Sequence, residues 1–112
     1  MNPVISVTSS SPAYIYLMID AMLSGAKAEG ADDPKMLEMI CRTVIGSAEM
    51  VLKSGKTPEE LIRMVKSPKG TTEQALNALS EHGFSEAVAD AMHRCTLRAE
   101  ELSAEFTSKT EM

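Results

Sequence analysis

Hydrophobic residues recur along this chain at helical spacing, in segments that glycine and proline separate. Segments 12–29 and 34–54 are apolar on more than one helical face, and every residue from Ala13 to Ile19 is apolar. A helix that is apolar on most sides must be buried on most sides, so these two segments need packing partners in several directions. Three shorter segments follow, over 59–66, 72–82 and 85–106. We therefore predict an all-α fold of about five helices, the first two long and broadly apolar.

The predicted helix boundaries come from capping residues, prolines and glycines. Three starts pair a capping side chain with proline at the first helical position, where no amide hydrogen is needed: Ser11–Pro12, Asp33–Pro34 and Thr57–Pro58. The other two starts carry a hydroxyl cap, from Thr71 or Thr72 and from Ser85. Helix ends are expected at three glycines, namely Gly30, Gly55 and Gly83.

These boundaries divide the chain into three parts. Residues 1–11 lack helical periodicity and are predicted to form an extended lead-in, residues 12–106 form one helical domain, and the polar residues 107–112 are predicted to fray. Gly46 lies inside the second predicted helix, where glycine costs about 1 kcal/mol relative to alanine. That cost favours a close helix crossing at Gly46.

The composition points to a chain that needs a partner. Its 112 residues are 44% hydrophobic but only 4% aromatic, with nine methionines and no tryptophan, so part of its stability is expected to come from a second chain. A net charge of −5 disfavours nucleic acid, which requires a cationic surface. No basic run marks a membrane surface, no apolar run is long enough to span a bilayer, and no segment reads as a signal peptide. We therefore expect a cytoplasmic protein with no nucleic-acid or membrane partner.

Several kinds of chemistry have no support in the sequence. The six glycines do not approach the G-x-G-x-x-G spacing of a dinucleotide site, and no βαβ pattern accompanies them. No Ser/His/Asp or Cys/His set indicates an autonomous enzyme. His93 and Cys95 face different ways on a helix and do not suit a metal; Cys41 and Cys95 are expected to be buried thiols, and Tyr14 and Tyr16 to pack in a core or interface. We predict no catalytic, cofactor-binding or metal-binding residue in this chain.

Segment 67–72, with the sequence Ser-Pro-Lys-Gly-Thr-Thr, is the most informative local feature. Gly70 lets the backbone approach a ligand closely, and the amides that open the next helix have no acceptor inside it. Those amides and the helix dipole favour a carboxylate or phosphate, and Ser67, Thr71 and Thr72 add hydroxyl groups. We predict an anion site made by Ser67, Gly70, Thr71 and Thr72; the alternative is an ordinary capped turn of the same composition.

This segment resembles the Ser-Pro-Gly-Gly-Thr-Thr segment of the pyrroline-5-carboxylate reductases. The helical domain of that family opens with Ser-Gly-Ser-Gly-Pro-Ala-Tyr, and this chain has Ser-Ser-Ser-Pro-Ala-Tyr over residues 9–14. Segments 43–48 and 82–84 are also similar to the family, as are the spacings between all four segments. The resemblance runs from about Val4 to Leu102, which is nearly the whole chain.

The chain departs from the family pattern at three positions. Lys69 stands where the family usually has glycine, and a lysine forced to positive φ costs roughly 1 kcal/mol. We predict that Lys69 lends positive charge to the carboxylate site. Ser9 and Ser11 replace two glycines before Pro12, which stiffens the entry to the first helix.

The resemblance implies a helical domain like the C-terminal domain of 6-phosphogluconate dehydrogenase, in which two long apolar helices interlock in a homodimer or larger oligomer. It implies an enzyme of proline biosynthesis that reduces 1-pyrroline-5-carboxylate to L-proline with NADPH or NADH held by a separate Rossmann domain. This chain would supply dimerisation and the substrate carboxylate site, and is expected to be inactive alone. By the same resemblance, the Ser67 hydroxyl and the amides around Thr71 and Thr72 hold the carboxylate of pyrroline-5-carboxylate or proline. The Thr72 hydroxyl then lies near the ring nitrogen.

Two other functions remain open from the sequence. One is a stand-alone dimerisation or interaction module without catalysis. The other is the helical domain of a different Rossmann-linked dehydrogenase, although the G-x-x-x-N-K-like pattern of hydroxyacid dehydrogenases is absent here. Because the resemblance begins at the joint between the two family domains, we expect either a shortened form of the enzyme or a natural fragment.

Overall fold

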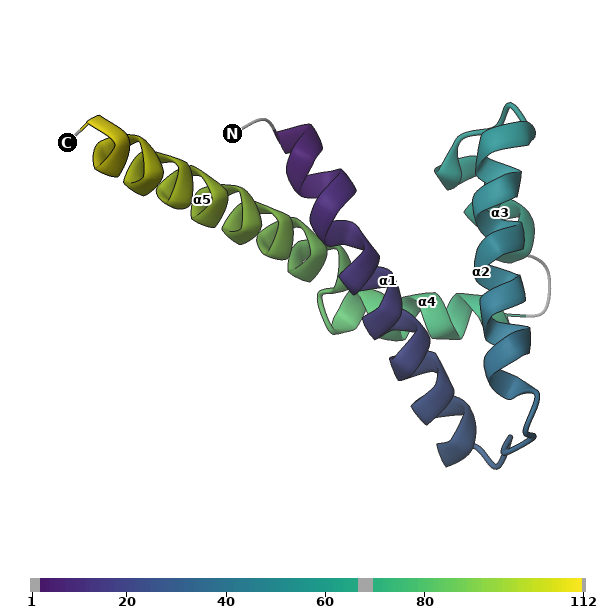
Figure 1. Ribbon diagram of the computed structural model, residues 1–112. Helices are drawn as coiled ribbons and strands as arrows, with labels where there is room; N and C mark the ends of the chain where they lie inside the picture. The colour runs from purple at the N-terminus through teal and green to yellow at the C-terminus, as the bar shows by residue number, and fades with distance from the viewer. Residues whose placement is uncertain (1–2, 67–69, 112) are drawn as a thin grey trace. The chain divides into compact units, whose positions relative to one another are not determined.

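The computed structural model describes residues 3–66 and 70–111, with side chains for residues 7–66 and 70–105. These residues form five helices and no strand: α1 (Pro3–Ala28), α2 (Met36–Lys53), α3 (Pro58–Lys66), α4 (Thr71–Glu81) and α5 (Phe84–Glu111) (Figure 1). The predicted all-α fold of five helices is confirmed. The chain divides into two compact units, one made of Met1–Ile15 with Ala78–Met112 and the other of Tyr16–Asn77. The two units are described separately below.

Helix α1 begins at Pro3, well before the start expected at Ser11–Pro12, so the predicted extended lead-in is wrong over residues 3–11. Pro12 lies inside the helix. It removes one N–H from the ladder, but its fixed φ is compatible with helix, so it weakens the helix without ending it. In the same unit, Ser10 Oγ lies 3.0 Å from Cys95 Sγ on α5. This contact with a distant residue favours helix at Ser10, just before the position where the capping signals of Ser11 and Pro12 predicted that the helix would begin.

The end of α1 is a Schellman motif, as its glycine predicts. The Gly30 N–H donates to the Lys27 carbonyl at 3.0 Å, and the Ala31 N–H donates to the Ala26 carbonyl at 2.8 Å. Gly30 has φ +88°, a left-handed conformation in which any other residue type would be strained. Among the described residues, no helix is both long and apolar enough to cross a membrane.

Helix α2 begins two positions later than its proline suggests. Asp33 Oδ1 accepts the Lys35 N–H at 2.7 Å, and the Asp33 carbonyl accepts the Met36 N–H at 2.9 Å, so residues 33–36 form a turn that leads into the helix. Pro34 therefore sits in this turn and not in the first helical position. The helix ends as expected before Gly55, which has φ +74°.

Helix α3 begins with a complete capping box. Thr57 Oγ1 accepts the Glu60 N–H at 3.2 Å, and Glu60 Oε1 accepts the Thr57 N–H at 3.3 Å. Pro58 occupies the first helical position, where its missing N–H costs nothing. The predicted start of this helix is confirmed.

Helices α4 and α5 are preceded by glycines that take the capping position, so the predicted hydroxyl caps are wrong. The Gly70 carbonyl accepts the Gln74 N–H at 2.9 Å, and the Gly83 carbonyl accepts the Ala87 N–H at 2.8 Å. Both glycines have positive φ, which turns the chain sharply into the next helix. Helix α5 also runs through residues 107–111, which were expected to fray. Their polarity is compatible with an exposed helix, so it was a poor signal for fraying.

The described side chains form very little core of their own. Ile40 on α2 is the one described hydrophobic residue that is buried, at 7% exposed, whereas Leu17 on α1 is 69% exposed and Leu52 on α2 is 81% exposed. Cys41 and Cys95 form no disulfide and are only half-buried, so the expectation of buried thiols is wrong. Burying one large aliphatic side chain stabilises by about 1.5–3 kcal/mol. Burial of the exposed hydrophobic residues against a partner would therefore add a large stabilisation.

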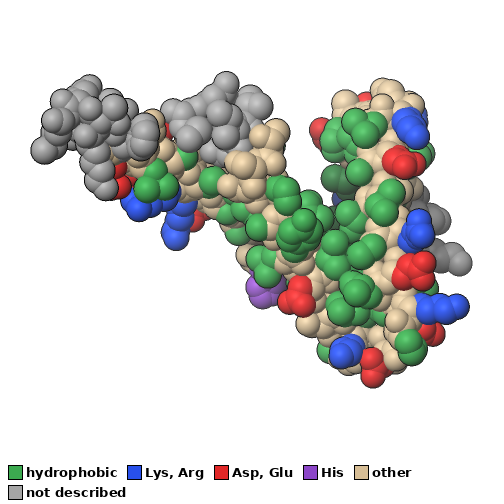
Figure 2. All heavy atoms as spheres, viewed as in Figure 1, with side chains coloured by type: hydrophobic (Ala, Val, Ile, Leu, Met, Phe, Trp, Pro, Cys, Tyr) green, Lys and Arg blue, Asp and Glu red, His purple; other side chains and the backbone are tan. Residues whose placement is uncertain are grey.

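Charged side chains occupy one side of α2 and leave the rest of that helix apolar. Glu38 pairs with Arg42 at 3.7 Å, and Glu49 pairs with Lys53 at 3.8 Å. Figure 2 shows this charged side beside the hydrophobic side chains of the same helix. Exposed pairs of this spacing contribute only about 0.3–0.5 kcal/mol each, so they mark a solvated face and are not a source of stability. The glycine expected at a close crossing, Gly46, has no heavy atom within 4 Å of its Cβ position, so the described residues do not make that crossing.

The capping box of α3 predicts a specific cost for its loss. Thr57→Ala removes the acceptor for the Glu60 N–H and is expected to lower the free energy of unfolding by about 1 kcal/mol. The matched control is Thr43→Ala in α2, whose hydroxyl donates to the Met39 carbonyl at 2.9 Å and competes with the backbone. Urea unfolding should show a near-zero or stabilising change for the control, and equal losses in both variants would contradict the assignment.

Candidate functional site

The first candidate site is the start of α4. Its first intrahelical hydrogen bond is the one from Gln74 to Gly70, so the N–H groups of Thr71, Thr72 and Glu73 precede the ladder and have no acceptor within the helix. Gly70 and Thr72 are half-buried and Thr71 is exposed. Three of the four predicted site residues thus stand consecutively at a helix N-terminus, as the anion-site prediction requires.

The rest of the predicted loop lies outside the described residues. This applies to Ser67, the fourth predicted ligand, and to Lys69, the predicted source of positive charge. Within the described part, Gly70 has φ +81° and no heavy atom within 4 Å of its Cβ position. A side chain at this position would have space but would strain φ. The backbone conformation, and not a lack of space, therefore requires glycine.

The charge around this helix start has two opposing contributions. The N-terminal end of the helix dipole and the exposed amides favour an anion, by about 0.3–1 kcal/mol for an exposed charge. Glu73 places a carboxylate in the same first turn and competes for that position. A bound carboxylate must therefore also be recognised by direct hydrogen bonds from the amides and from the threonine hydroxyls.

A groove of about 420 Å³ adjoins this helix start within the unit Tyr16–Asn77. Its walls come from α2, α3 and α4, and its apolar lining includes Met50, Val51, Leu61, Ile62, Val65 and Leu76. Among the described residues, Ser47 and Thr72 supply the polar groups of the groove, and its lining includes no charged side chain. Thr72 therefore belongs both to the candidate anion site and to the wall of the groove.

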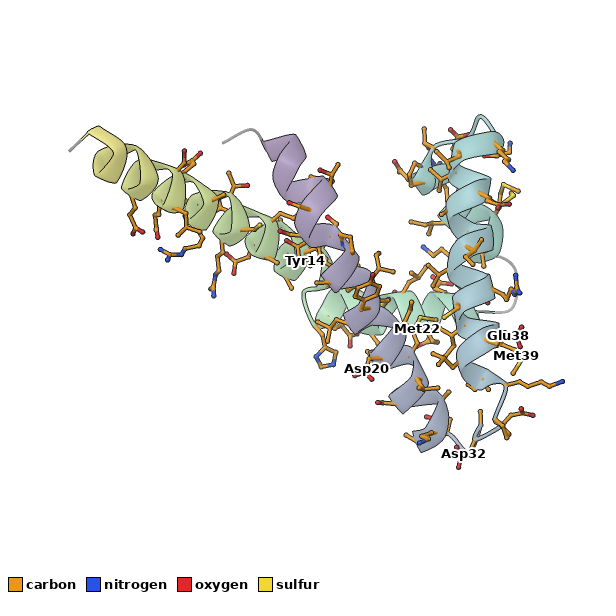
Figure 3. The ribbon with its side chains drawn as sticks, viewed as in Figure 1. Tyr14, Asp20, Met22, Asp32, Glu38 and Met39 are labelled. Carbon is orange, nitrogen blue, oxygen red and sulfur yellow. The ribbon has the colours of Figure 1, made fainter. Side chains whose placement is uncertain are left out.

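A second cluster lies in the other unit, where α1 and α5 meet. Tyr14 on α1 (Figure 3) forms a side-chain hydrogen bond with Cys95 on α5, and Ser10 Oγ also lies 3.0 Å from Cys95 Sγ. Sequence analysis placed Tyr14 in a packing role but did not connect it with Ser10 and Cys95. The pairing joins residues 85 positions apart, so no local pattern could have indicated it.

The surroundings of Tyr14 change its ionisation. Partial burial raises the pKa of the Tyr14 hydroxyl above 10.0, because burial disfavours the phenolate; the charge of the Cys95 thiolate and the hydrogen bond to Cys95 act in the same direction. A raised folded-state pKa means that the folded protein holds this proton more tightly than the unfolded chain. The stability contributed by Tyr14 is therefore complete below pH 10.0 and is lost as pH rises through its folded-state pKa.

Comparison with known proteins identifies the family. A family described as "Pyrroline-5-carboxylate reductase dimerisation" matches residues 1–102. The chain belongs to this family. The match includes α1 to α4, the segment 67–72 and most of α5, and so confirms the resemblance found in the sequence.

Several pyrroline-5-carboxylate reductases are similar to nearly the whole chain. The protein from Escherichia coli (strain K12) is 42% identical over 103 residues, which is 92% of this chain and 38% of the relative. The protein from Methanosarcina acetivorans is 41% identical over 91% of the chain and 38% of its own length. Pyrroline-5-carboxylate reductase 2 of Bacillus subtilis is 36% identical over 95% of the chain and 38% of its own length. The chain thus spans somewhat over a third of the curated relatives that it matches.

The Tyr14 cluster yields a test that uses the small number of tyrosines. The chain has two, so in Tyr16→Phe the tyrosinate absorbance reports Tyr14 alone. We expect the signal of the folded variant to appear at higher pH than that of the same variant unfolded in urea. Adding Cys95→Ala should move the folded titration toward the unfolded one, because it removes the thiolate and the hydrogen bond. Coincident folded and unfolded curves in Tyr16→Phe would contradict the assignment.

Proposed function

We propose that this chain provides the dimerisation and substrate-holding part of a pyrroline-5-carboxylate reductase. The whole enzyme would reduce 1-pyrroline-5-carboxylate to L-proline with NADPH or NADH, in the cytoplasm. The observation that carries this proposal is the family match over residues 1–102, combined with a helix N-terminus at the predicted site residues. Those residues are Gly70, Thr71 and Thr72, together with Ser67 outside the described part.

The role of the α4 start follows from the charge of the substrate. Pyrroline-5-carboxylate and proline both carry a carboxylate, and the N–H groups of Thr71, Thr72 and Glu73 are donors that need an acceptor. A carboxylate placed there accepts these donors and interacts favourably with the helix dipole. The Thr72 hydroxyl is proposed to contact the ring nitrogen, so that one short segment orients both the carboxylate and the neighbouring nitrogen of the substrate.

The nicotinamide cofactor has no matching site in the described residues. They form helices only, and the six glycines of the chain lack the spacing of a dinucleotide-binding loop. The cofactor would supply hydride for the C=N carbon when bound to a part of the enzyme other than these residues. The contribution proposed for this chain is orientation of the substrate and complementarity to its charge.

The dimer part of the proposal rests on exposed apolar surface. Leu17 is 69% exposed and Leu52 is 81% exposed, on the two helices that the sequence predicts to interlock with a second copy. A domain that buries one described hydrophobic residue needs further burial to offset its conformational entropy. Helix-on-helix packing between copies would provide that burial.

A dimerisation module without catalysis is the second candidate. The exposed apolar side chains on α1 and α2 favour it as strongly as they favour the enzyme, because dimerisation does not require the α4 site. The two candidates differ in whether the start of α4 binds a carboxylate.

The dimer predicts a sedimentation result. The chain should sediment as a dimer at micromolar concentration, and Leu17→Lys should shift it toward monomer, because an unpaired lysine is costly to bury. Asp20→Asn on the same helix makes the same change in net charge and serves as the control; Asp20 is exposed on α1 (Figure 3). A well-folded monomer for the unchanged chain at these concentrations would refute the dimer.

The carboxylate site predicts a specific NMR response. L-proline should shift the amide resonances of Gly70, Thr71, Thr72 and Glu73, whereas L-prolinamide, which lacks the carboxylate, should not. The amide of Glu60 is an internal control, because Thr57 already caps it. Thr72→Ala should weaken proline binding several-fold, as loss of a hydrogen bond to a charged ligand predicts. Equal responses to proline and prolinamide would favour the module without catalysis.

A further inference from the structure

Residues 3–11, here called the entry segment, open helix α1 although their sequence disfavours a helix. Apart from Pro3, every residue of the segment is valine, isoleucine, threonine or serine. β-Branched side chains lose rotamer freedom in a helix, and serine and threonine hydroxyls compete with the backbone for its hydrogen bonds. The β-branched residues are also well suited to extended backbone. Local preference therefore favours the extended form of this segment over the helix that the structure contains.

Pro12 follows the entry segment directly and separates it from the rest of α1. Proline has no N–H, so position 12 donates no helical hydrogen bond, and its ring crowds the carbonyl four residues earlier. The residue before a proline, here Ser11, is also pushed away from helical backbone. If the entry segment unwinds, Ser11 and Pro12 become the cap and the first position of a shorter helix, where serine and proline are both favoured. The sequence therefore contains two alternative starts for α1.

The contacts that favour the longer helix are made with α5, in the same unit of the chain. Ser10 Oγ lies 3.0 Å from Cys95 Sγ, and Tyr14 forms a side-chain hydrogen bond with the same cysteine (Figure 3). Ser10 and Tyr14 are four residues apart and therefore share one face of a helix. Extended backbone before Pro12 would carry Ser10 away from that face. Simultaneous contact of Ser10 and Tyr14 with one sulfur thus requires helix at the end of the entry segment.

Burial follows the same contact on both helices, here called the α1–α5 seam. On α5 the half-buried residues are spaced three or four apart and share one face: Met92, Cys95, Thr96 and Ala99. On α1 the half-buried residues next to them are Ser10, Ser11 and Tyr14, whereas Val7 is 42% exposed. Among the described side chains, the seam therefore combines partial burial with hydrogen bonds to one thiol. Few buried apolar contacts are typical of a segment that opens locally.

We propose that the entry segment is a two-state element, which extends α1 while Ser10 and Tyr14 contact Cys95 and unwinds as far as Pro12 when they are released. In the released state α1 begins at Ser11–Pro12, the start that the capping signals predict. The distance from residue 3 to residue 12 is about 14 Å in a helix and about 30 Å in extended chain. The contacts at Cys95 therefore control how far this segment reaches. The inference concerns residues other than those of the candidate carboxylate site, so it is independent of the ligand bound there.

NMR on the full chain tests the two states, through Cα chemical shifts of residues 4–11 and hydrogen exchange of the amides of residues 7–11. The unchanged chain should show helical shifts and protected amides. Cys95→Ala removes both contacts, so protection should fall by about tenfold or more and the shifts should move toward extended values. Ser10→Ala should act in the same direction. Because alanine is the better helix former, an effect of helix propensity alone would have the opposite sign.

A second substitution tests the role of Pro12, and a matched control tests the cysteine. Pro12→Ala restores the missing N–H, so residues 7–11 should be better protected in Pro12→Ala/Cys95→Ala than in Cys95→Ala. Cys41→Ala makes the same change at a half-buried cysteine of the other unit and should leave residues 7–11 unchanged. The amides of α2 and α3 report whether each variant stays folded. If Cys95→Ala does not fold, the milder Ser10→Ala carries the test.

Three results would overturn the two-state element. Unchanged protection of residues 7–11 in Ser10→Ala and in folded Cys95→Ala would show that the seam does not hold the entry segment. Loss of helix that continues past Pro12 into residues 16–28, or no recovery in the double variant, would show that Pro12 does not limit the unwinding. Extended shifts for residues 4–11 in the unchanged chain would contradict the docked state itself. None of these results alters the expected response of Gly70 to Glu73 to proline, so the proposed function is tested separately.

Discussion

The exposed apolar surface of α1 and α2 is the constraint on which the rest of this structure depends. Five helices form with well-defined ends, yet Ile40, at 7% exposed, is the one described hydrophobic residue that is buried. Charged pairs such as Glu49–Lys53 mark the side of α2 that water can occupy. The remaining sides are aliphatic, and hydrophobic burial is the main favourable term in folding. The helices are therefore built for packing that one copy does not complete.

The candidate carboxylate site depends on the first-turn amides of a helix, which have no acceptor within the helix. At α3 the capping box of Thr57 and Glu60 satisfies these donors internally. At α4 the preceding residue is Gly70, which has no side chain to serve as a cap and which takes a left-handed conformation. The two starts therefore differ: the first is capped by its own side chains, and at the second no described side chain caps the donors.

The two features meet at Thr72, which opens α4 and lines the apolar groove. In a family known by its dimerisation, this position would connect assembly with substrate orientation. The chain spans somewhat over a third of the length of the reductases that it matches. In the proposed function the contribution of this chain would be geometric, because a helix start that is fixed by packing would hold its amides in place before a carboxylate binds.

The sequence alone determined features that depend on nearest neighbours. It predicted the all-α class, the helix ends at Gly30 and Gly55, the capped start at Thr57 and the family, because each of these follows from backbone conformation or from a local motif. It also predicted that Gly70, Thr71 and Thr72 stand at one helix start, while their ligand stays a prediction. Tertiary structure decided the rest. Helix α1 extends back through Pro12 where Ser10 meets Cys95, and the pKa of Tyr14 is raised by burial and by the same distant cysteine. Thr72 joins a groove with residues of α2 and α3. Such contacts join residues far apart in the chain, and no spacing rule within a helix can specify them.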